Sequence, residues 1–223
     1  MSGGLRLHYH PGNASLIPHI VLREIGVPFE LAFVDRDNDA HHSPGYLALN
    51  PNGKIPVLVD DRDGRGLAIF ETAAICLHLA DAFPQAGLAP PPGSGARAGC
   101  YAWLAWSSAS LQPALMAWFY PERWVDAGDT AAAAQLRAHA QASIHGMLDL
   151  LDAQLASHGG PWVLGESYGI VDPYAFTLCR WTRGFVERPA RARPHIGPFL
   201  QRMLARPAVR EALAAEGLAE PFV

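Results

Sequence analysis

The sequence predicts two domains, an N-terminal domain that mixes strands with helices and a C-terminal domain made of helices alone. Strand-like apolar runs occur only in the first third of the chain, where they alternate with helical periodicity. A stretch rich in Pro, Gly and Ala follows, which is typical of a linker. We therefore expect a first domain over residues 1–84, a linker over residues 85–96 and an all-α domain over residues 97–223.

The N-terminal domain is predicted to open with a βαβ unit. Residues 5–10 and 29–35 form short strand-like runs. Residues 17–25 carry apolar side chains at helical spacing, with Ser15 as a candidate N-cap and Gly26 as a candidate C-cap. Two strands joined by a helix predict a parallel pair with a right-handed crossover.

A short helix, a hairpin and a longer helix complete this domain. The short helix is expected at residues 44–49. The next strand, residues 55–59, contains Pro56 near its start, where a residue that cannot donate to a β ladder is tolerated. A polar, Gly-rich turn leads to a partner strand at residues 67–70, and a helix follows to residue 82. The order β-α-β-α-β-β-α is that of a thioredoxin-like domain.

The C-terminal domain is predicted from helical periodicity alone. Its expected helices cover residues 97–118, 130–157, 171–185, 194–205 and 207–216. Pro113 should kink or split the first of them, because proline removes a helical N–H and its ring clashes with the preceding turn.

Composition excludes several classes of function. Lys plus Arg is 17 and Asp plus Glu is 21, so no basic excess points to nucleic acid. No apolar run approaches the roughly 20 residues of a membrane helix, and the N-terminus lacks the apolar core of a signal peptide. We expect a cytoplasmic protein with no membrane partner. Cys76, Cys100 and Cys179 are far apart in apolar helical patterns, which predicts buried thiols.

The stretch from residue 50 to residue 72 carries the main functional prediction. Pro56 starts a strand, so the N–H and C=O of Ile55 are left to pair with an extended ligand. Glu71 and Thr72 lie where a strand gives way to a helix, whose N-terminus suits an anionic group, while the Glu71 carboxylate suits an ammonium. Together they suit the head of a free amino acid, although Glu71-Thr72 alone is also typical of an ordinary helix cap.

Ile55-Pro56 followed by Glu71-Thr72 at this spacing resembles the glutathione-binding half of a glutathione transferase. In that family the Ile/Val-Pro pair, with a cis proline, bonds the cysteinyl backbone of glutathione, and the Glu-Ser/Thr pair holds its γ-glutamyl end. The resemblance implies glutathione as co-substrate. Lys54 is a candidate for the glycyl carboxylate, and a solvated lysine is the equal alternative.

The resemblance covers nearly the whole chain. Within the family, the sequence is similar to bacterial, beta-class-like members. This similarity rests further on residues 18–24 and residues 165–174. The second block matches a helix-capping box in which Gly169 replaces the usual Ser or Thr. Asp172 remains and is expected to bond backwards to the cap N–H.

Such an enzyme needs the glutathione sulfur as thiolate, and the usual donor is missing here. Lowering a thiol pKa from ~8.5 by two units needs about 2.7 kcal/mol, which one good charged hydrogen bond supplies. Beta-class members carry a cysteine at the position of Ala14, so no mixed disulfide with glutathione is expected. The candidate donors are Asn13 at the serine position of related members, then Ser15, and then Tyr9 at the position of a tyrosine. Ser15 is alternatively the helix N-cap, and Tyr9 is alternatively core.

The helical domain is expected to supply an apolar pocket. Its aromatic residues suit a helix core, or a pocket for an electrophile walled mainly by Trp118 and Tyr120. Gln112 stands where related enzymes carry a histidine near the sulfur. His8, His10, His41 and His42 are interpreted as solvated or structural histidines, so no metal is expected.

These observations predict a homodimeric glutathione transferase-like enzyme that joins glutathione to an apolar electrophile; the dimer is implied by the resemblance alone. Two alternatives stay open. One is a glutathione-dependent disulfide or peroxide reductase on the same scaffold. The other is a glutathione-binding protein without catalysis, which the missing cysteine favours.

Overall fold

The computed structural model describes residues 4–223, which divide into two compact units. The first unit runs to Ala89 and also includes Leu204–Glu220, and the second comprises Pro90–Met203 with Pro221–Val223. The sequence alone assigns residues 204–220 to the helical domain. The structure groups this segment with the first unit because its helix packs against the first helix of the chain.

A four-stranded mixed sheet forms the centre of the first unit, as a thioredoxin-like fold requires. Its strands are β1 (Leu5–Tyr9), β2 (Phe29–Phe33), β3 (Val57–Asp60) and β4 (Leu67–Phe70). The spatial order is β2-β1-β3-β4; β1 and β2 are parallel, whereas β1–β3 and β3–β4 are antiparallel. The predicted parallel pair and the predicted hairpin are both confirmed.

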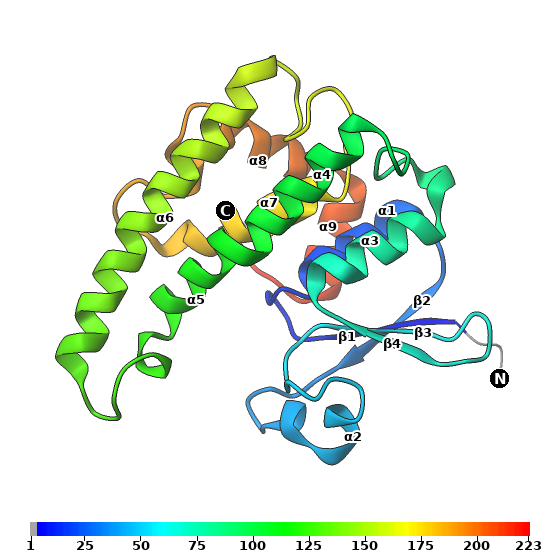
Figure 1. Ribbon diagram of the computed structural model, residues 1–223, viewed down its shortest axis with the longest axis horizontal. Coiled ribbons are helices and arrows are strands. Elements are labelled where there is room, and N and C mark those ends of the chain that lie inside the picture. Colours follow the sequence, from blue (N-terminus) through cyan, green and yellow to red (C-terminus); the bar gives the residue numbers. More distant parts are fainter. Residues whose placement is uncertain (1–3) are drawn as a thin grey trace. The chain divides into compact units, whose positions relative to one another are not determined.

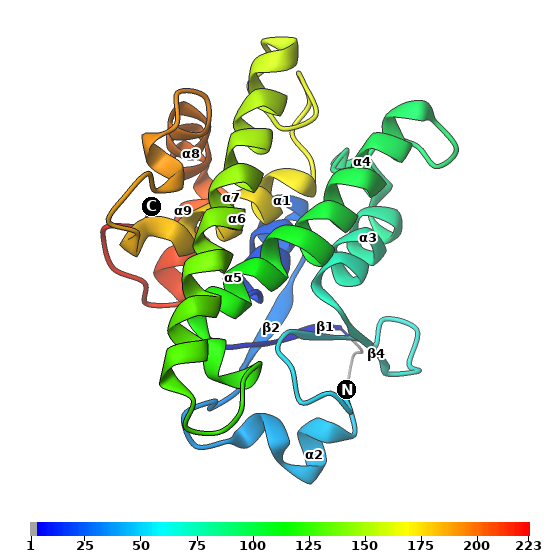
Figure 2. The same cartoon turned by 60° about the vertical axis from the view of Figure 1, so that its left-hand side comes forward.

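Helices cover the sheet of the first unit on both sides. Helices α1 (Leu16–Ile25) and α3 (Thr72–Ala82) lie over one face, and the short α2 (Pro44–Leu47) lies on the other side (Figures 1 and 2). Helix α9 (Pro207–Ala215) packs along α1. The first seven side chains of α1 are all buried. This burial on the sheet side and on the α9 side explains why the apolar periodicity of α1 is so broad.

The second unit consists of helices, as its sequence predicts. Its helices are α4 (Gly95–Trp106), α5 (Gln112–Phe119), α6 (Thr130–His158), α7 (Val171–Trp181) and α8 (Ile196–Ala205). All eleven side chains of α7 are buried, so this helix is the centre of the unit. In Figure 1 the long α6 is drawn beside α5, with which it makes extensive contacts.

The helix predicted over residues 97–118 is split near Pro113, as expected. A π-helical turn, Ser107–Leu111, separates α4 from α5, and Pro113 lies in the first turn of α5. Proline is tolerated in a first turn because its missing N–H would have no helical partner there. The π turn provides the transition, so the chain continues without an intervening loop.

Asp172 forms the backward hydrogen bond that the capping box predicts. Its carboxylate accepts from the N–H of Gly169 at 2.8 Å and from the N–H of Val163 at 2.9 Å. The second bond ties the preceding turn to the first turn of α7. Asp172 is 1% exposed, so its two backbone partners are what make burial of this carboxylate tolerable.

The three cysteines are buried, as predicted. Burial raises the pKa of the Cys179 thiol to about 12, so this sulfur is a core atom with little thiolate character. Among residues 4–223, no helix combines the length and the apolar character that crossing a membrane requires.

Candidate glutathione site

Three segments that the sequence singles out meet at one end of the sheet. The strand register pairs His8 with Val57, and Val57 with Phe70. The loop after β1, the Ile55-Pro56 segment before β3 and the Glu71-Thr72 segment after β4 therefore leave the sheet at the same end. This convergence brings together segments that are far apart in the sequence.

Two side-chain hydrogen bonds hold the segment before β3 in place. The side-chain amide of Asn50 donates to the carbonyl of Lys54 at 2.7 Å, and the Tyr46 hydroxyl donates to the same carbonyl at 2.9 Å. Burial raises the pKa of Tyr46, which keeps its hydroxyl protonated as a donor. The Lys54 side chain is exposed and makes no ion pair within the described chain.

Beyond this support, the backbone of Ile55 is open. The Ile55–Pro56 peptide bond is cis. Pro56 is buried, and neither the N–H nor the C=O of Ile55 is hydrogen-bonded within residues 4–223. Ile55 lies two residues before β3, an inner strand of the sheet that begins at Val57, so its donor and acceptor stand beyond the last paired residues of the ladder.

Glu71 occupies an uncommon backbone conformation at the start of α3. Its φ and ψ are 69° and 115°, and its side chain accepts no hydrogen bond from the first turn of the helix. The alternative of an ordinary cap is therefore wrong for Glu71. Positive φ in a residue with a side chain costs about 1–3 kcal/mol, and such strain is concentrated at functional sites. The exposed Glu71 carboxylate and the open N–H groups after it stand together at the helix N-terminus.

The last residue of β1 and the loop after it supply the three candidate donors, and one of them, Ser15, already has hydrogen-bond partners. Its hydroxyl is fully buried, donates to the carbonyl of His10 at 3.0 Å and accepts from the N–H of His10 at 3.2 Å. Ser15 is the residue before α1, as predicted, but its side chain makes no capping bond to the helix. The hydroxyl closes the loop instead.

Asn13 and Tyr9 are the less constrained candidates. The N–H of Asn13 donates to the carbonyl of His10 at 3.2 Å, while its half-buried side-chain amide makes no hydrogen bond within the described residues. The half-buried ring of Tyr9 lies edge-on to Phe33, with centroids 6.0 Å apart. Ala14, which follows Asn13 in this loop, is 7% exposed.

The same loop is anchored by a residue that the sequence does not single out. The Glu216 carboxylate accepts from the N–H of Gly12 at 2.8 Å and lies 2.8 Å from Nδ1 of His19. Arg23 Nε donates to His19 Nε2 at 3.3 Å, so the imidazole accepts on that side and donates from Nδ1 to Glu216. No local pattern could reveal this network, because Glu216 is 197 residues from His19.

The predicted pocket residues lie in and just after α5, and each is engaged within the second unit. Gln112 accepts from the Tyr174 hydroxyl at 2.8 Å. Trp118 donates from Nε1 to Gln141 at 3.2 Å. The guanidinium of Arg123 lies 4.1 Å from the centre of the Tyr120 ring. All three predicted residues are half-buried, so part of each stays accessible.

The comparisons with known proteins point to one family. The model described as "Glutathione S-transferase, N-terminal domain" matches residues 14–82, and its C-terminal counterpart matches residues 111–207. Glutathione S-transferase GstA of Escherichia coli O157:H7 is 32% identical over 215 residues, which cover 96% of this chain and 100% of that protein.

Solved structures of glutathione S-transferases are similar to this chain in both sequence and fold. A sphingomonad glutathione S-transferase complexed with glutathione is 33% identical, with a TM-score of 0.80, over 96% of this chain and 100% of that one. The beta-class enzyme of Sphingomonas chungbukensis is 31% identical, with the same TM-score and coverage. The chain belongs to the glutathione S-transferase family.

Proposed function

We propose that this chain is a glutathione transferase that binds glutathione at the end of its sheet and adds the thiolate to an apolar electrophile. One observation carries the proposal. The unpaired backbone of Ile55, the uncapped helix N-terminus with Glu71 and Thr72, and the loop that contains Asn13 lie at the same end of one sheet. Glutathione offers an extended backbone, a charged amino-acid head and a thiol to match them.

Each end of the tripeptide has a chemical counterpart. The N–H and C=O of Ile55 pair with the cysteinyl backbone in the manner of an added strand. The Glu71 carboxylate takes the ammonium of the γ-glutamyl group, and the N–H groups after Glu71, with Thr72, take its carboxylate. The exposed Lys54 ammonium meets the glycyl carboxylate at the other end.

Asn13 is the donor that we favour for the sulfur. Its amide N–H groups make no other hydrogen bond within the described chain, whereas the Ser15 hydroxyl is buried and doubly bonded to His10. A hydrogen bond to a charged acceptor contributes about 1.5–3 kcal/mol, which matches the roughly two pKa units needed. Tyr9 remains the next candidate, because its ring is half-buried.

The electrophile is proposed to lie on the accessible side of the helical unit's aromatic residues. Trp118 and Tyr120 offer apolar ring faces, and Gln112 offers an amide whose orientation is set by Tyr174. An electrophile with an apolar body gains roughly 25 cal/mol for each Å² that it buries against such rings.

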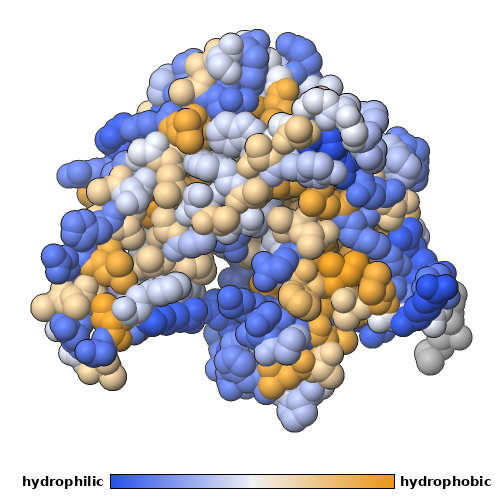
Figure 3. All heavy atoms as spheres, viewed as in Figure 1, coloured by the Kyte–Doolittle hydropathy of each residue, from blue (hydrophilic) through white to orange (hydrophobic). Residues whose placement is uncertain are grey.

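A homodimer is proposed as the assembly. Leu67 and Phe70 of the edge strand β4 are 51% and 38% exposed. Apolar side chains gather over this part of the surface in Figure 3. An exposed edge strand can pair with another chain, and exposed apolar patches mark interaction sites. Light scattering of the purified protein checks the assembly.

Calorimetric titration with glutathione tests the binding half of the proposal. Glu71→Gln removes the charge that meets the ammonium and should weaken binding by about tenfold or more. The matched control is Glu30→Gln, an exposed glutamate on β2 that should leave the affinity unchanged. Full affinity in Glu71→Gln would reject the proposed pose.

Kinetics separate catalysis from binding alone. With a chloronitroaromatic substrate, Asn13→Ala should lower kcat by about tenfold to a hundredfold, and the isosteric Asn13→Asp should lower it further because it places a negative charge beside the thiolate. A mixed-disulfide substrate assayed alongside identifies a reductase. Variants at Asn13 that match the wild type in every assay would favour a binding protein without catalysis.

A further inference from the structure

Two adjacent histidines and one aspartate form a compact group that includes none of the residues assigned to glutathione. Asp39 precedes the short 3₁₀ helix Ala40–His42 and has a left-handed backbone, with φ of 59°. One potential ligand atom from each of Asp39, His41 and His42 lies within 4.8 Å of the others. In the part of the chain that the structure describes, this is the single group of three or more such side chains with that spacing.

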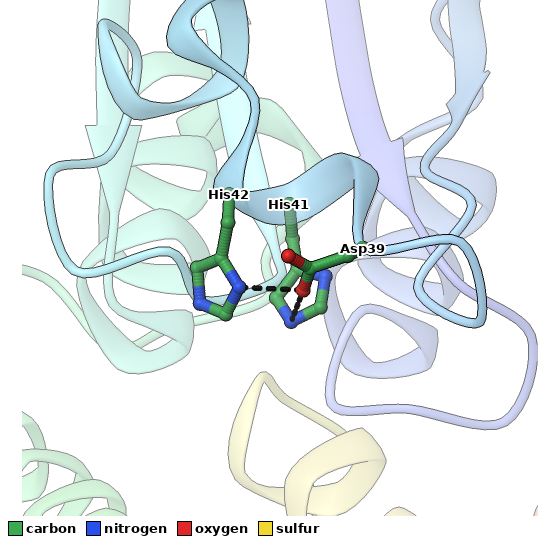
Figure 4. A group of neighbouring side chains, drawn as sticks. All are labelled: Asp39, His41 and His42. Carbon is green, nitrogen blue, oxygen red and sulfur yellow. Dashed lines mark hydrogen bonds and ion pairs between the residues drawn. The ribbon is translucent and has the colours of Figure 1, made fainter.

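Both imidazoles face one oxygen of the Asp39 carboxylate. Figure 4 shows both imidazoles turned toward the Asp39 carboxylate. The same oxygen, Oδ1, lies 2.6 Å from Nδ1 of His42 and 3.8 Å from Nε2 of His41. Two ligands of a tetrahedral zinc ion, each at about 2.0–2.2 Å, are about 3.3–3.6 Å apart. Small side-chain rotations therefore bring both nitrogens and the carboxylate to bonding distance from one ion.

The chain around the group holds one histidine in place and leaves access to the other side. The His41 side chain is only 16% exposed, whereas those of His42 and Asp39 are 53% and 70% exposed. The His42 ring lies against Gly53, where an added Cβ would be 2.5 Å from the ring carbon Cδ2. A glycine at this position, with φ of 59°, makes room for the ring.

We propose that Asp39, His41 and His42 bind one zinc ion or a divalent transition ion of similar chemistry. Two imidazoles and a carboxylate favour zinc, cobalt, nickel or copper, whereas magnesium and calcium prefer oxygen ligands alone. The exposed side of the group leaves the fourth position to water. The histidines alone suggest only solvated side chains, and the left-handed turn at Asp39 is what brings the carboxylate between them.

The test uses tag-free protein in buffer without glutathione or other thiols, because free thiolates compete for zinc. Calorimetric titration with Zn²⁺ should give one site per chain, and Co²⁺ should give visible absorption of a four- or five-coordinate site. Asp39→Asn and His42→Ala should each weaken zinc binding by about tenfold or more, since even outer-shell changes cost 10–100-fold. His42→Gln provides a second variant of similar size.

The matched control is His139→Ala, which removes an exposed histidine of α6 and should leave zinc binding unchanged. Four results would overturn the proposal. The first is the absence of stoichiometric zinc binding, and the second is unchanged affinity in the His42 variants. The third is a sulfur-to-cobalt charge-transfer band in the spectrum, which would place the ion on cysteine. Equal binding of Mg²⁺ would also overturn it, because it would indicate attraction to charge alone.

Discussion

The carboxylate of Glu216 lies 2.8 Å from Nδ1 of His19, and both side chains are fully buried. The same carboxylate holds the N–H of Gly12 in the loop that carries the proposed sulfur donor. The segment after α9 thus fixes the start of α1 from a distance of about two hundred residues in sequence. Buried, hydrogen-bonded carboxylates of this kind specify one arrangement of the backbone around them.

Glu216→Gln should lower the free energy of unfolding by about 1–3 kcal/mol. In the variant, the NH₂ group that replaces one oxygen must face either the Gly12 N–H or the His19 N–H. Two hydrogen-bond donors then face each other and one bond is lost. Urea denaturation should show a lower midpoint with an unchanged slope. Glu211→Gln is the control, because its side chain is 60% exposed and lies 3.6 Å from Arg23, a pair expected to contribute less than about 1 kcal/mol. Equal losses in both variants would contradict this account.

Glu71→Gly should stabilise the protein by about 1 kcal/mol while it weakens glutathione binding. Glycine adopts a φ of 69° without steric cost, so the strain at the start of α3 is released, and the carboxylate is lost. Glu71→Ala loses the carboxylate but keeps the strain, so it should bind glutathione as poorly without the gain in stability. Thermal unfolding and calorimetry on the same two variants test this; an equally stabilised Glu71→Ala would show that strain is not the cause.

Ala14→Cys should acquire a mixed disulfide with glutathione that the wild type does not form. The new thiol stands at the start of α1, where a helix N-terminus favours thiolate. The three native cysteines are buried, with exposures of 0%, 1% and 2%, and should not react in folded protein. Intact-mass spectrometry after incubation with oxidised glutathione measures the adduct, and Ala14→Ser serves as the control. An adduct on the wild type would mean that a native thiol is accessible.

Asp60 should make stability depend on pH in acid. Hydrogen bonds from Arg62 and then from His78 hold the pKa of this carboxyl far below its usual range. A group whose pKa is lower in the folded state contributes its full stability above its unfolded pKa of about 3.9, and this contribution is lost as pH falls below that value. Asp60→Asn should therefore cost about 1.5–3 kcal/mol at neutral pH and progressively less between about pH 5 and pH 2. Urea denaturation of the wild type and of Asp60→Asn across this pH range measures the difference in stability. A difference that does not change with pH would contradict the assignment.

Local patterns predicted much of the fold because they act over a few residues. Gly26 ends α1 in the left-handed conformation, with a φ of 76°, as expected for a glycine at a helix C-terminus. Asp172 bonds back to Gly169 over three residues, as its spacing predicts. Strand β4 begins and ends at the predicted residues, between the polar turn and the following helix.

Some local signals have two solutions, and packing chose between them. Ser15 stands at the N-cap position, yet its hydroxyl bonds to His10 in the preceding loop and does not cap α1. Glu71 stands at a second N-cap position and leaves its helix uncapped. A propensity scale counts residue types, and it cannot decide which of two nearby partners a short side chain reaches.

By itself, the sequence determined the order of strands and helices, the βαβ pairing and the hairpin between residues 55 and 70, since all of these follow from periodicity, turn chemistry and chain handedness. The tertiary structure alone decided that Glu216 returns to Gly12 and His19, that residues 204–220 belong with the first unit, and that Asp39 turns its carboxylate toward His41 and His42. The first two depend on contacts between segments far apart in the chain, and the third depends on a backbone angle that few residues adopt. Neither kind of information is present in a short window of sequence.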